Sequence, residues 1–159
     1  MILQLDSFRT NQVVINLLSN ALKFSKAFDT IYVKLRATIQ EHSDDAELQI
    51  DVTDTGCGIS ADEQAKIFTP YFKSRNSDSL AKNAYGNGLG LSICQRIMTR
   101  LNGSITVKSN LGQGSTFTMS LQTKNFKEPL KPNDTVRIPY LNLFSYLSHR
   151  HYFVCVVRK

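Results

Sequence analysis

The chain has 159 residues, a length that fits one domain with a short extension and is too small for two full domains. Its composition, with 42% hydrophobic and 20% charged residues, is typical of a globular protein and excludes wholesale disorder. The longest apolar run, residues 152–157, is far shorter than the roughly 20 residues that cross a bilayer. Three cysteines without C-x-x-C spacing argue against a disulfide framework or a zinc knuckle. The sequence shows no secretory signal peptide, so we expect an intracellular, cytoplasmic protein.

The positive charge is concentrated at the C-terminal end. Residues 1–123 carry twelve Lys and Arg against eleven Asp and Glu, whereas residues 124–159 carry seven against two. Basic tails can contact nucleic acid or anionic lipid through phosphate charge. This one has no dense basic run, so a solvated extension is favoured and no nucleic-acid partner is expected. We therefore expect one domain over residues 1–123 and a basic, mostly irregular tail over residues 124–159.

The first predicted element is a helix over residues 8–24, where apolar side chains recur at helical spacing and Asp6 or Ser7 can cap the start. Two runs of alternating apolar and polar residues follow, over residues 31–39 and 48–53. Such alternation is typical of strands that bury one face. The turn-forming residues between the two runs indicate a hairpin.

The next helix is expected to begin with a capping box, because Ser60 and Glu63 have the required spacing. In a capping box, each side chain satisfies a backbone N–H at the start of the helix. The later elements are, in chain order, this short helix to Phe68, a polar surface loop over residues 73–87, a helix over residues 89–101, and a hairpin of strands 104–109 and 115–122.

Three polar side chains form one stripe on the first helix. Asn16, Asn20 and Lys23 stand at positions i, i+4 and i+7, so they lie on one helix face. One interpretation is an ordinary solvated face, since short motifs match by chance. The other is a site for a metal-bound triphosphate, because amide oxygens suit Mg²⁺ and a lysine neutralises phosphate.

Two glycine-bearing segments could approach a ligand closely. In Asp54-x-Gly56-x-Gly58 the acid could accept a hydrogen bond from an exocyclic amine, and the glycines would let a flat ring lie against the backbone. A tight turn is the alternative explanation. The glycines of residues 86–90 lie where a loop enters a helix, a place that favours phosphate. They do not follow a strand, which disfavours a Rossmann site, and no Walker loop occurs.

The order of these segments is more specific than any one of them. With two further segments they resemble the asparagine, phenylalanine and glycine boxes of sensor histidine kinases, and all five occur in the family order within residues 6–122. The segments are Asn-Leu-Leu-Ser-Asn-Ala-Leu-Lys-Phe-Ser (16–25), Asp-Thr-Gly-Cys-Gly-Ile (54–59), Ile-Phe-Thr-Pro-Tyr-Phe (67–72), Gly-Asn-Gly-Leu-Gly-Leu-Ser-Ile (86–93) and Gly-Gln-Gly-Ser-Thr-Phe (112–117).

This resemblance implies the GHKL superfamily of ATP-binding domains, which includes gyrase, the heat-shock chaperone ATPases and the mismatch-repair ATPases. It implies the Bergerat fold, an α/β two-layer sandwich with a mixed, mostly antiparallel sheet and helices on one face. The ligands that it implies are ATP and Mg²⁺. Domains of the family usually have a strand and a helix before the asparagine box, and the domain over residues 1–123 is expected to lack them.

The resemblance also assigns roles to single residues. Asn20 is similar to the Mg²⁺ ligand of the family, Asn16 and Lys23 to its phosphate-side contacts, and Asp54 to the acceptor of the adenine amine. Lys73 stands where these kinases commonly carry Arg, so it offers a point charge in place of a bidentate fork.

The remaining implied site residues surround the nucleotide. Those expected to line the base pocket are Gly56, Gly58 and Thr116. The triphosphate is expected beside Gly86, Gly88 and Gly90, at the base of a lid over residues 69–87. The apolar anchors of that lid would be Phe68 and Phe72, for which ordinary apolar packing is an equally good explanation.

The residue one turn before Asn20 separates two functional classes. Hydrolytic relatives carry a glutamate general base there, whereas this chain has Asn16, whose amide cannot take a proton from water. A neutral imidazole needs no such base. We therefore expect a protein histidine kinase of a two-component phosphorelay, in which Mg²⁺, Lys23 and Lys73 stabilise the transferred γ-phosphoryl group. A catalytically inactive nucleotide-binding module and a GHKL-type ATPase remain alternatives.

None of the three histidines has the His-Glu-x-x-Asn/Thr setting of the family's phosphoacceptor. His42 lies in an acidic turn, and His149 and His151 lie in the tail. We therefore expect a histidine-bearing dimerisation domain, supplied in trans or by a missing region, and a response regulator as partners. The chain is compatible with the cytosolic part of a membrane-associated sensor system.

Overall fold

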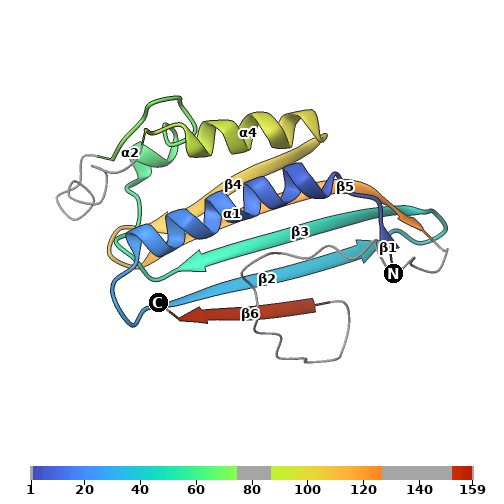
Figure 1. Cartoon of the computed structure of the whole chain (residues 1–159), viewed down its shortest axis with the longest axis horizontal. Coiled ribbons are helices and arrows are strands. Elements are labelled where there is room, and N and C mark those ends of the chain that lie inside the picture. The colour runs from blue at the N-terminus through green and yellow to red at the C-terminus, as the bar shows by residue number, and fades with distance from the viewer. Residues whose placement is uncertain (1, 75–86, 127–151, 159) are drawn as a thin grey trace.

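A computed structural model of the chain describes residues 2–74, 87–126 and 152–158. In these segments most of the strands follow one another directly along the chain, and the helices lie between them (Figure 1). The elements are β1 (Ile2–Leu3), α1 (Ser7–Phe24), β2 (Thr30–Ile39), β3 (Asp45–Asp54), α2 (Ala61–Gln64), α4 (Gly90–Arg100), β4 (Gly103–Asn110), β5 (Gly114–Phe126) and β6 (Tyr152–Arg158).

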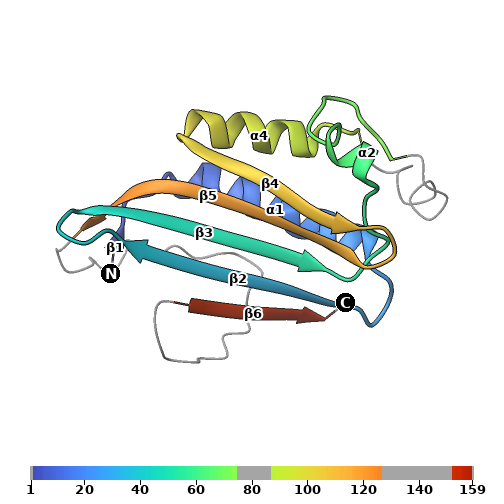
Figure 2. The same ribbon diagram turned by 180° about the vertical axis from the view of Figure 1, so that it is seen from behind.

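The strands form one sheet, and every pairing between the described strands is antiparallel. β5 pairs with β3, β4 and β1, while β2 lies between β3 and β6. The long helices α1 and α4 lie on one face of this sheet, and the view from behind shows the opposite face without a described helix (Figures 1 and 2). The expected two-layer sandwich with helices on one face is confirmed.

Helix α1 begins and ends where its sequence provides caps. Oδ1 of Asp6 accepts a hydrogen bond from the N–H of Arg9 at 3.0 Å, which satisfies one of the unpaired N–H groups of the first turn. At the other end, the Oγ and the N–H of Ser25 both donate to the carbonyl of Ala21, at 2.7 and 3.1 Å. The buried face of the helix consists of Thr10, Val13, Val14, Leu17 and Ala21. Burying each large apolar side chain contributes about 1.5–3 kcal/mol.

Alternation along β3 and β5 decides which side chains face the helices. Every second residue of β3 from Ala46 to Asp54 is buried, and the same is true of β5 from Ser115 to Leu121. The register places Asp54 opposite Ser115. The apolar face against which α1 packs therefore ends in a carboxylate and a hydroxyl.

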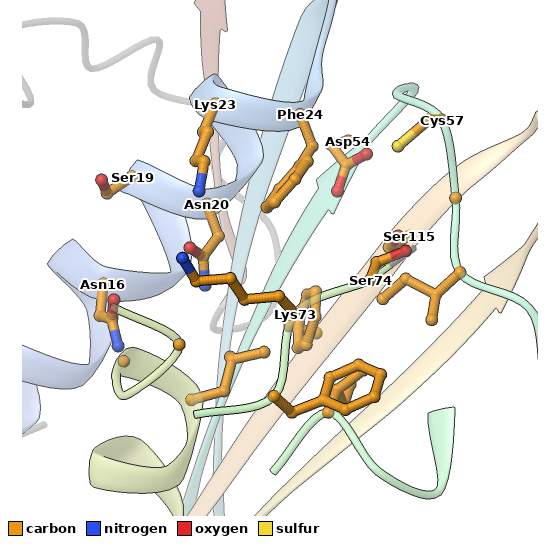
Figure 3. Close-up of a pocket in the computed structure, with 18 of the residues that line it drawn as sticks. Asn16, Ser19, Asn20, Lys23, Phe24, Asp54, Cys57, Lys73, Ser74 and Ser115 are labelled. Atoms are coloured by element: carbon orange, nitrogen blue, oxygen red, sulfur yellow. The ribbon is translucent and has the colours of Figure 1, made fainter. Parts of the chain in front are cut away.

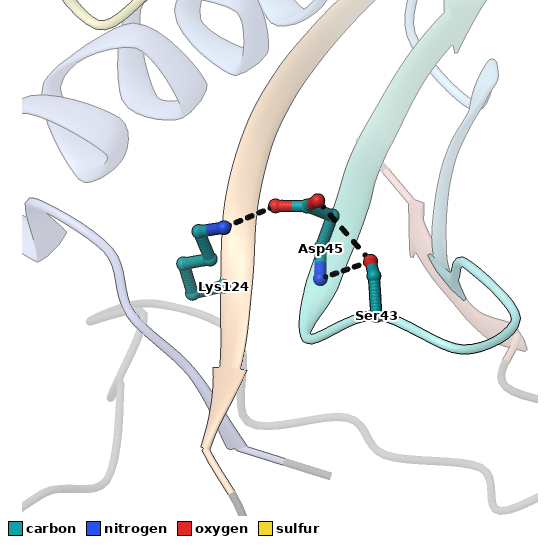
Figure 4. Close-up of polar contacts among 3 residues, drawn as sticks. All are labelled: Ser43, Asp45 and Lys124. Carbon is teal, nitrogen blue, oxygen red and sulfur yellow. Dashed lines mark hydrogen bonds and ion pairs between the residues drawn. The ribbon is translucent and has the colours of Figure 1, made fainter.

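The other end of the β2–β3 hairpin is tied to β5 by an ion pair (Figure 4). The ammonium of Lys124 contacts Oδ1 of Asp45. The Oγ of Ser43 donates to Oδ2 of the same carboxylate at 3.1 Å and accepts from the N–H of Asp45 at 2.8 Å. The hydrogen bonds from Lys124 and Ser43 lower the pKa of Asp45.

Two elements differ from the sequence expectations. The helix predicted to reach Phe68 is only the four residues of α2, followed by turns, and its N-cap Ser60 makes no side-chain hydrogen bond to the helix backbone. In the C-terminal region, β6 forms a strand along β2, although the tail was expected to be mostly irregular. The apolar run at 152–157 was the available signal for β6. The domain boundary at residue 123 stays a prediction.

Among the helices of the described segments, none has the length and apolar character that a membrane span needs.

Candidate functional site

A cavity of about 310 Å³ lies where α1, the end of β3, the start of β5 and the start of α4 meet (Figure 3). Its walls combine polar, charged and aromatic side chains from segments that are far apart in the sequence. The structure brings most of the sequence-predicted site residues together here. Those that line the cavity are Asn16, Asn20, Lys23, Asp54, Gly58, Phe72, Lys73, Gly88 and Gly90.

Helix α1 presents its polar stripe to the cavity, because its apolar face is occupied by the sheet. Asn16, Asn20 and Lys23 all line the cavity from this helix. The ammonium of Lys23 lies 4.9 Å from the centroid of the Phe24 ring. Burial lowers the pKa of Lys23, and the nearby charge of Lys73 lowers it further. Two lysines that face each other in a partly closed space favour a polyanionic ligand.

The segment after α2 supplies the second lysine. The side chain of Lys73 extends across the cavity toward α1 (Figure 3). The neighbouring Ser74 donates from Oγ to Oε1 of Glu63 at 2.8 Å, and the other oxygen of that carboxylate accepts from Ser60 at 3.1 Å. Glu63 therefore holds the segment that carries Lys73, instead of forming the expected capping box.

Another wall carries Asp54, the single carboxylate among the described residues that line the cavity. This side chain is 5% exposed, and its Oδ1 accepts from the N–H of Gly56 at 2.9 Å. A Cβ at Gly56 would lie only 2.5 Å from the carbonyl oxygen of Phe24, so a residue without a side chain is required there. The tight turn therefore places the carboxylate against the end of α1, facing the cavity.

The start of α4 forms the floor beside Asn16. Gly88, Gly90 and Leu91 line the cavity, and the N-cap residue Leu89 makes no side-chain hydrogen bond to the first turn. The first N–H groups of a helix, together with its dipole, attract phosphate. This start of an 11-residue helix is therefore placed to contact an anion in the cavity.

Three of the predicted residues that the structure describes do not line this cavity. Thr116 lies on the opposite face of the sheet, where its hydroxyl is 2.9 Å from that of Thr53 and it lines a second, more open cavity. The alternation of β5 turns Ser115, and not Thr116, toward the helices, so Ser115 lines the cavity where Thr116 was expected. Gly56 lies against the carbonyl of Phe24 and the side chain of Asp54, and Phe68 packs against the core. Gly86 lies outside the described residues, as does most of the predicted lid.

Several lining residues were missed by the sequence analysis. The pattern of alternation could have identified Ser115, and the position of Phe24 next to Lys23 on α1 could have identified that ring. The other missed residues, except Ser74, lie within the five quoted segments, beside residues that were predicted. The missed residues are Ser19, Phe24, Cys57, Ile59, Ile67, Ser74, Asn87, Leu91, Ser115 and Phe117.

A metal could be held here through an amide oxygen. Within the described ranges there is no group of three or more His, Cys, Asp and Glu side chains that could hold a metal ion. Magnesium takes few protein ligands and keeps several waters alongside substrate phosphates. The carboxamide of Asn20, which lines the cavity on the same stripe as Lys23, fits that kind of coordination.

Comparison with known families agrees with this geometry. The sequence model of the family described as histidine kinase-, DNA gyrase B-, and HSP90-like ATPase matches residues 5–125. This range covers most of the chain and includes every residue that lines the cavity. The chain belongs to this family. The expectation of a histidine-kinase-type ATPase domain is therefore confirmed.

The similar proteins include sensor kinases. The sensor histidine kinase RcsC of Escherichia coli (strain K12) is 38% identical over 126 residues, which are 79% of this chain and 12% of RcsC. The aerobic respiration control sensor protein ArcB of the same organism is 34% identical over 142 residues, 87% of this chain and 17% of ArcB. The crystal structure of full-length ShkA in complex with AMPPNP is 30% identical, with a TM-score of 0.57, over 77% of this chain and 23% of ShkA. This chain spans less than a fifth of the length of these curated relatives.

Proposed function

We propose that the chain is the ATP-binding catalytic domain of a two-component or phosphorelay histidine kinase. It binds Mg-ATP and transfers the γ-phosphoryl group to a histidine that another subunit, or another region of a longer protein, supplies. The observation that carries this proposal is the distribution of charge in one cavity. Lys23 and Lys73 provide positive charge on two facing walls, and Asp54 provides a buried acceptor on another wall. A purine that carries a polyphosphate complements both.

Each wall of the cavity has a role in this proposal. Asp54 accepts a hydrogen bond from the exocyclic amine of adenine, and Gly58 lets the ring approach the backbone. Lys23, Lys73 and the first turn of α4 bind the phosphates. When Mg²⁺ is bound, with Asn20 as its protein ligand, it neutralises phosphate oxygens.

The chemical step needs positioning more than proton transfer. A histidine nitrogen attacks the γ-phosphorus, the P–N bond forms, and the bond from phosphorus to the bridging oxygen breaks, so that ADP leaves with the electron pair. The two lysines stabilise the charge on the transferring group. Asn16 provides no carboxylate to deprotonate water, so hydrolysis lacks a base, whereas a neutral imidazole attacks without one.

Calorimetric titration with Mg-ATP and Mg-ADP tests the binding step. We expect both nucleotides to bind, and an absence of binding would contradict the proposal. Transfer is tested with γ-labelled ATP and an added dimerisation domain from a sensor kinase. We expect the label on the histidine of that domain and its loss with Asn20→Asp. Binding without transfer would indicate a nucleotide-binding module, and steady phosphate release would indicate a hydrolytic ATPase.

The partners and the location follow from the same proposal. The relatives named above are a sensor histidine kinase and a sensor protein of aerobic respiration control. We infer that a histidine-bearing dimerisation domain and a response regulator act with this chain in the cytoplasm. A pull-down with purified partner domains, in the presence and absence of Mg-ATP, measures the first of these contacts.

A further inference from the structure

Helix α4 contacts the side-chain amide of Asn16 at two residues. Nδ2 of Asn16 donates a hydrogen bond to Sγ of Cys94 at 2.9 Å. The carboxamide also lies against Gly90, where an added Cβ would come within 2.6 Å of Oδ1 and 2.8 Å of Nδ2. Gly90 and Cys94 are one turn apart on the same helix face, so both contacts come from one rigid element. The amide is therefore held against this face of α4 by a hydrogen bond at one residue and close packing at the other.

The thiol of Cys94 is suited to accept this hydrogen bond. The residue is 1% exposed, and burial raises the pKa of its thiol. A neutral thiol has sulfur lone pairs that accept weakly from an amide N–H. Figure 3 shows the nitrogen of Asn16 turned toward the start of α4. The oxygen is the other end of the carboxamide, and it lies beside Gly90, which lines the cavity.

We propose that Cys94 is a positioning residue, which fixes the amide of Asn16 so that its oxygen is presented to the nucleotide site. This inference rests on the proposed binding of Mg-ATP and deepens it. An amide oxygen attracts a metal ion or a metal-bound water and repels phosphate oxygens. Asn16 then favours the magnesium complex over the metal-free nucleotide, a different role from the phosphate contact that the sequence suggested.

The test uses two nearly isosteric substitutions, Cys94→Val and Cys94→Thr, which differ in whether a hydroxyl acceptor is present. The dissociation constant for ATP is measured in Mg²⁺ and in a chelator. We expect Cys94→Val to weaken Mg-ATP binding about fivefold, the value of one hydrogen bond, and to leave metal-free ATP binding unchanged. We expect Cys94→Thr to restore most of the loss.

A matched control is Ile97→Val, which trims another buried side chain of α4 that does not line the cavity. It should lower the melting temperature without changing the preference for the magnesium complex. If the Val and Thr variants do not fold, the pair Cys94→Ala and Cys94→Ser is measured against the same expectations.

Two results would overturn the inference. One is equal binding of Mg-ATP by the variants with and without the acceptor. The other is an equal loss of affinity for metal-free ATP and for Mg-ATP. That result would mean that the amide NH2 group of Asn16 faces the phosphates or that the effect is only structural. If the unsubstituted chain does not bind Mg-ATP, the proposed function itself fails. If the unsubstituted chain binds Mg-ATP and the Cys94 variants keep the same preference for the magnesium complex, only the proposed role of Cys94 is wrong.

Discussion

Strand β3 begins with Asp45 and ends with Asp54, and the two carboxylates have opposite surroundings. The side chain of Asp45 is 46% exposed and is paired with Lys124 and Ser43 at the far end of the sheet. Asp54 is 5% exposed and lines the cavity beneath the helices. The two positions are an odd number of residues apart, so they face opposite sides of the strand. Burial and the neighbouring elements, and not the residue type, therefore distinguish the exposed, ion-paired Asp45 from the buried Asp54 of the cavity.

The comparison is tested most strongly by replacing each aspartate with asparagine. Asp54→Asn should weaken Mg-ATP binding on the order of 100-fold, because one oxygen of the buried carboxylate becomes an amide NH2, a donor that faces the exocyclic amine of adenine. Asp45→Asn should leave the dissociation constant unchanged. Calorimetry on both variants measures this difference, and equal losses at the two ends would show that Asp54 acts through the fold alone.

The two lysines that line the cavity should contribute to binding of the phosphates and not to binding of the adenine base. We expect Lys23→Met to weaken ATP binding about tenfold and Lys73→Met to weaken it about threefold, because Lys73 is the more exposed of the two. Adenosine should bind each variant as it binds the unsubstituted chain. Lys26→Met removes a nearby exposed lysine that does not line the cavity and is the control. A parallel loss of adenosine binding would contradict a phosphate role.

A smaller effect should appear at alkaline pH. The pKa of Lys23 is lowered from its ordinary 10.5 by burial and by Lys73, so the folded chain loses this proton before the unfolded chain does. Stability should rise with pH between the two pKa values, because the unfolded chain binds the extra proton there. ATP affinity should fall as pH rises through the lowered value, since phosphate favours the charged form.

One variant distinguishes the two causes of the lowered pKa of Lys23. Lys73→Met removes the repulsion, so the decline in ATP affinity should move to higher pH. Titrations from about pH 7 to 10 follow it, with adenosine as the uncharged reference. A decline that stays in place would assign the shift to burial alone.

The smallest effect is expected for the ion pair between Asp45 and Lys124. The pKa of Asp45 is lowered below 3.8 by Lys124 and Ser43, so the stabilisation is complete above that pH and is lost as pH falls through the lowered value. The pair is solvent-accessible and screened by salt, so the melting temperature should change little. The melting temperatures of Lys124→Met and of the unsubstituted chain are compared at neutral and at acid pH. A difference in melting temperature that grows on acidification would contradict the pairing.

The sequence predicts the helix and strand positions well because α1, β2, β3 and α4 carry regular periodicity. It also predicts the charged side chains that line the cavity, since five ordered segments resemble one family of sites. Asn16, Asn20 and Lys23 needed only the helical repeat to be placed on one face. Their joint arrangement with Asp54 required the resemblance, because no local rule brings α1 to the end of β3.

Other features depend on contacts between distant segments. The choice between Ser115 and Thr116 follows from the β3–β5 register, which one-residue errors reverse. The hydrogen bond between Asn16 and Cys94 joins residues 78 positions apart. β6 forms by pairing with β2, a long-range partner that composition does not reveal. Tertiary contacts therefore decided the details that local patterns left open.

The alternation of β3 has a consequence for how this domain can change in evolution. The turn between β2 and β3 can gain or lose residues without altering the direction of any side chain in the cavity. A single residue inserted within β3 would instead turn the carboxylate of Asp54 to the outer face and expose half of the apolar strand. Length variation among natural descendants should therefore be confined to the turns, while the number of residues in β3 stays constant.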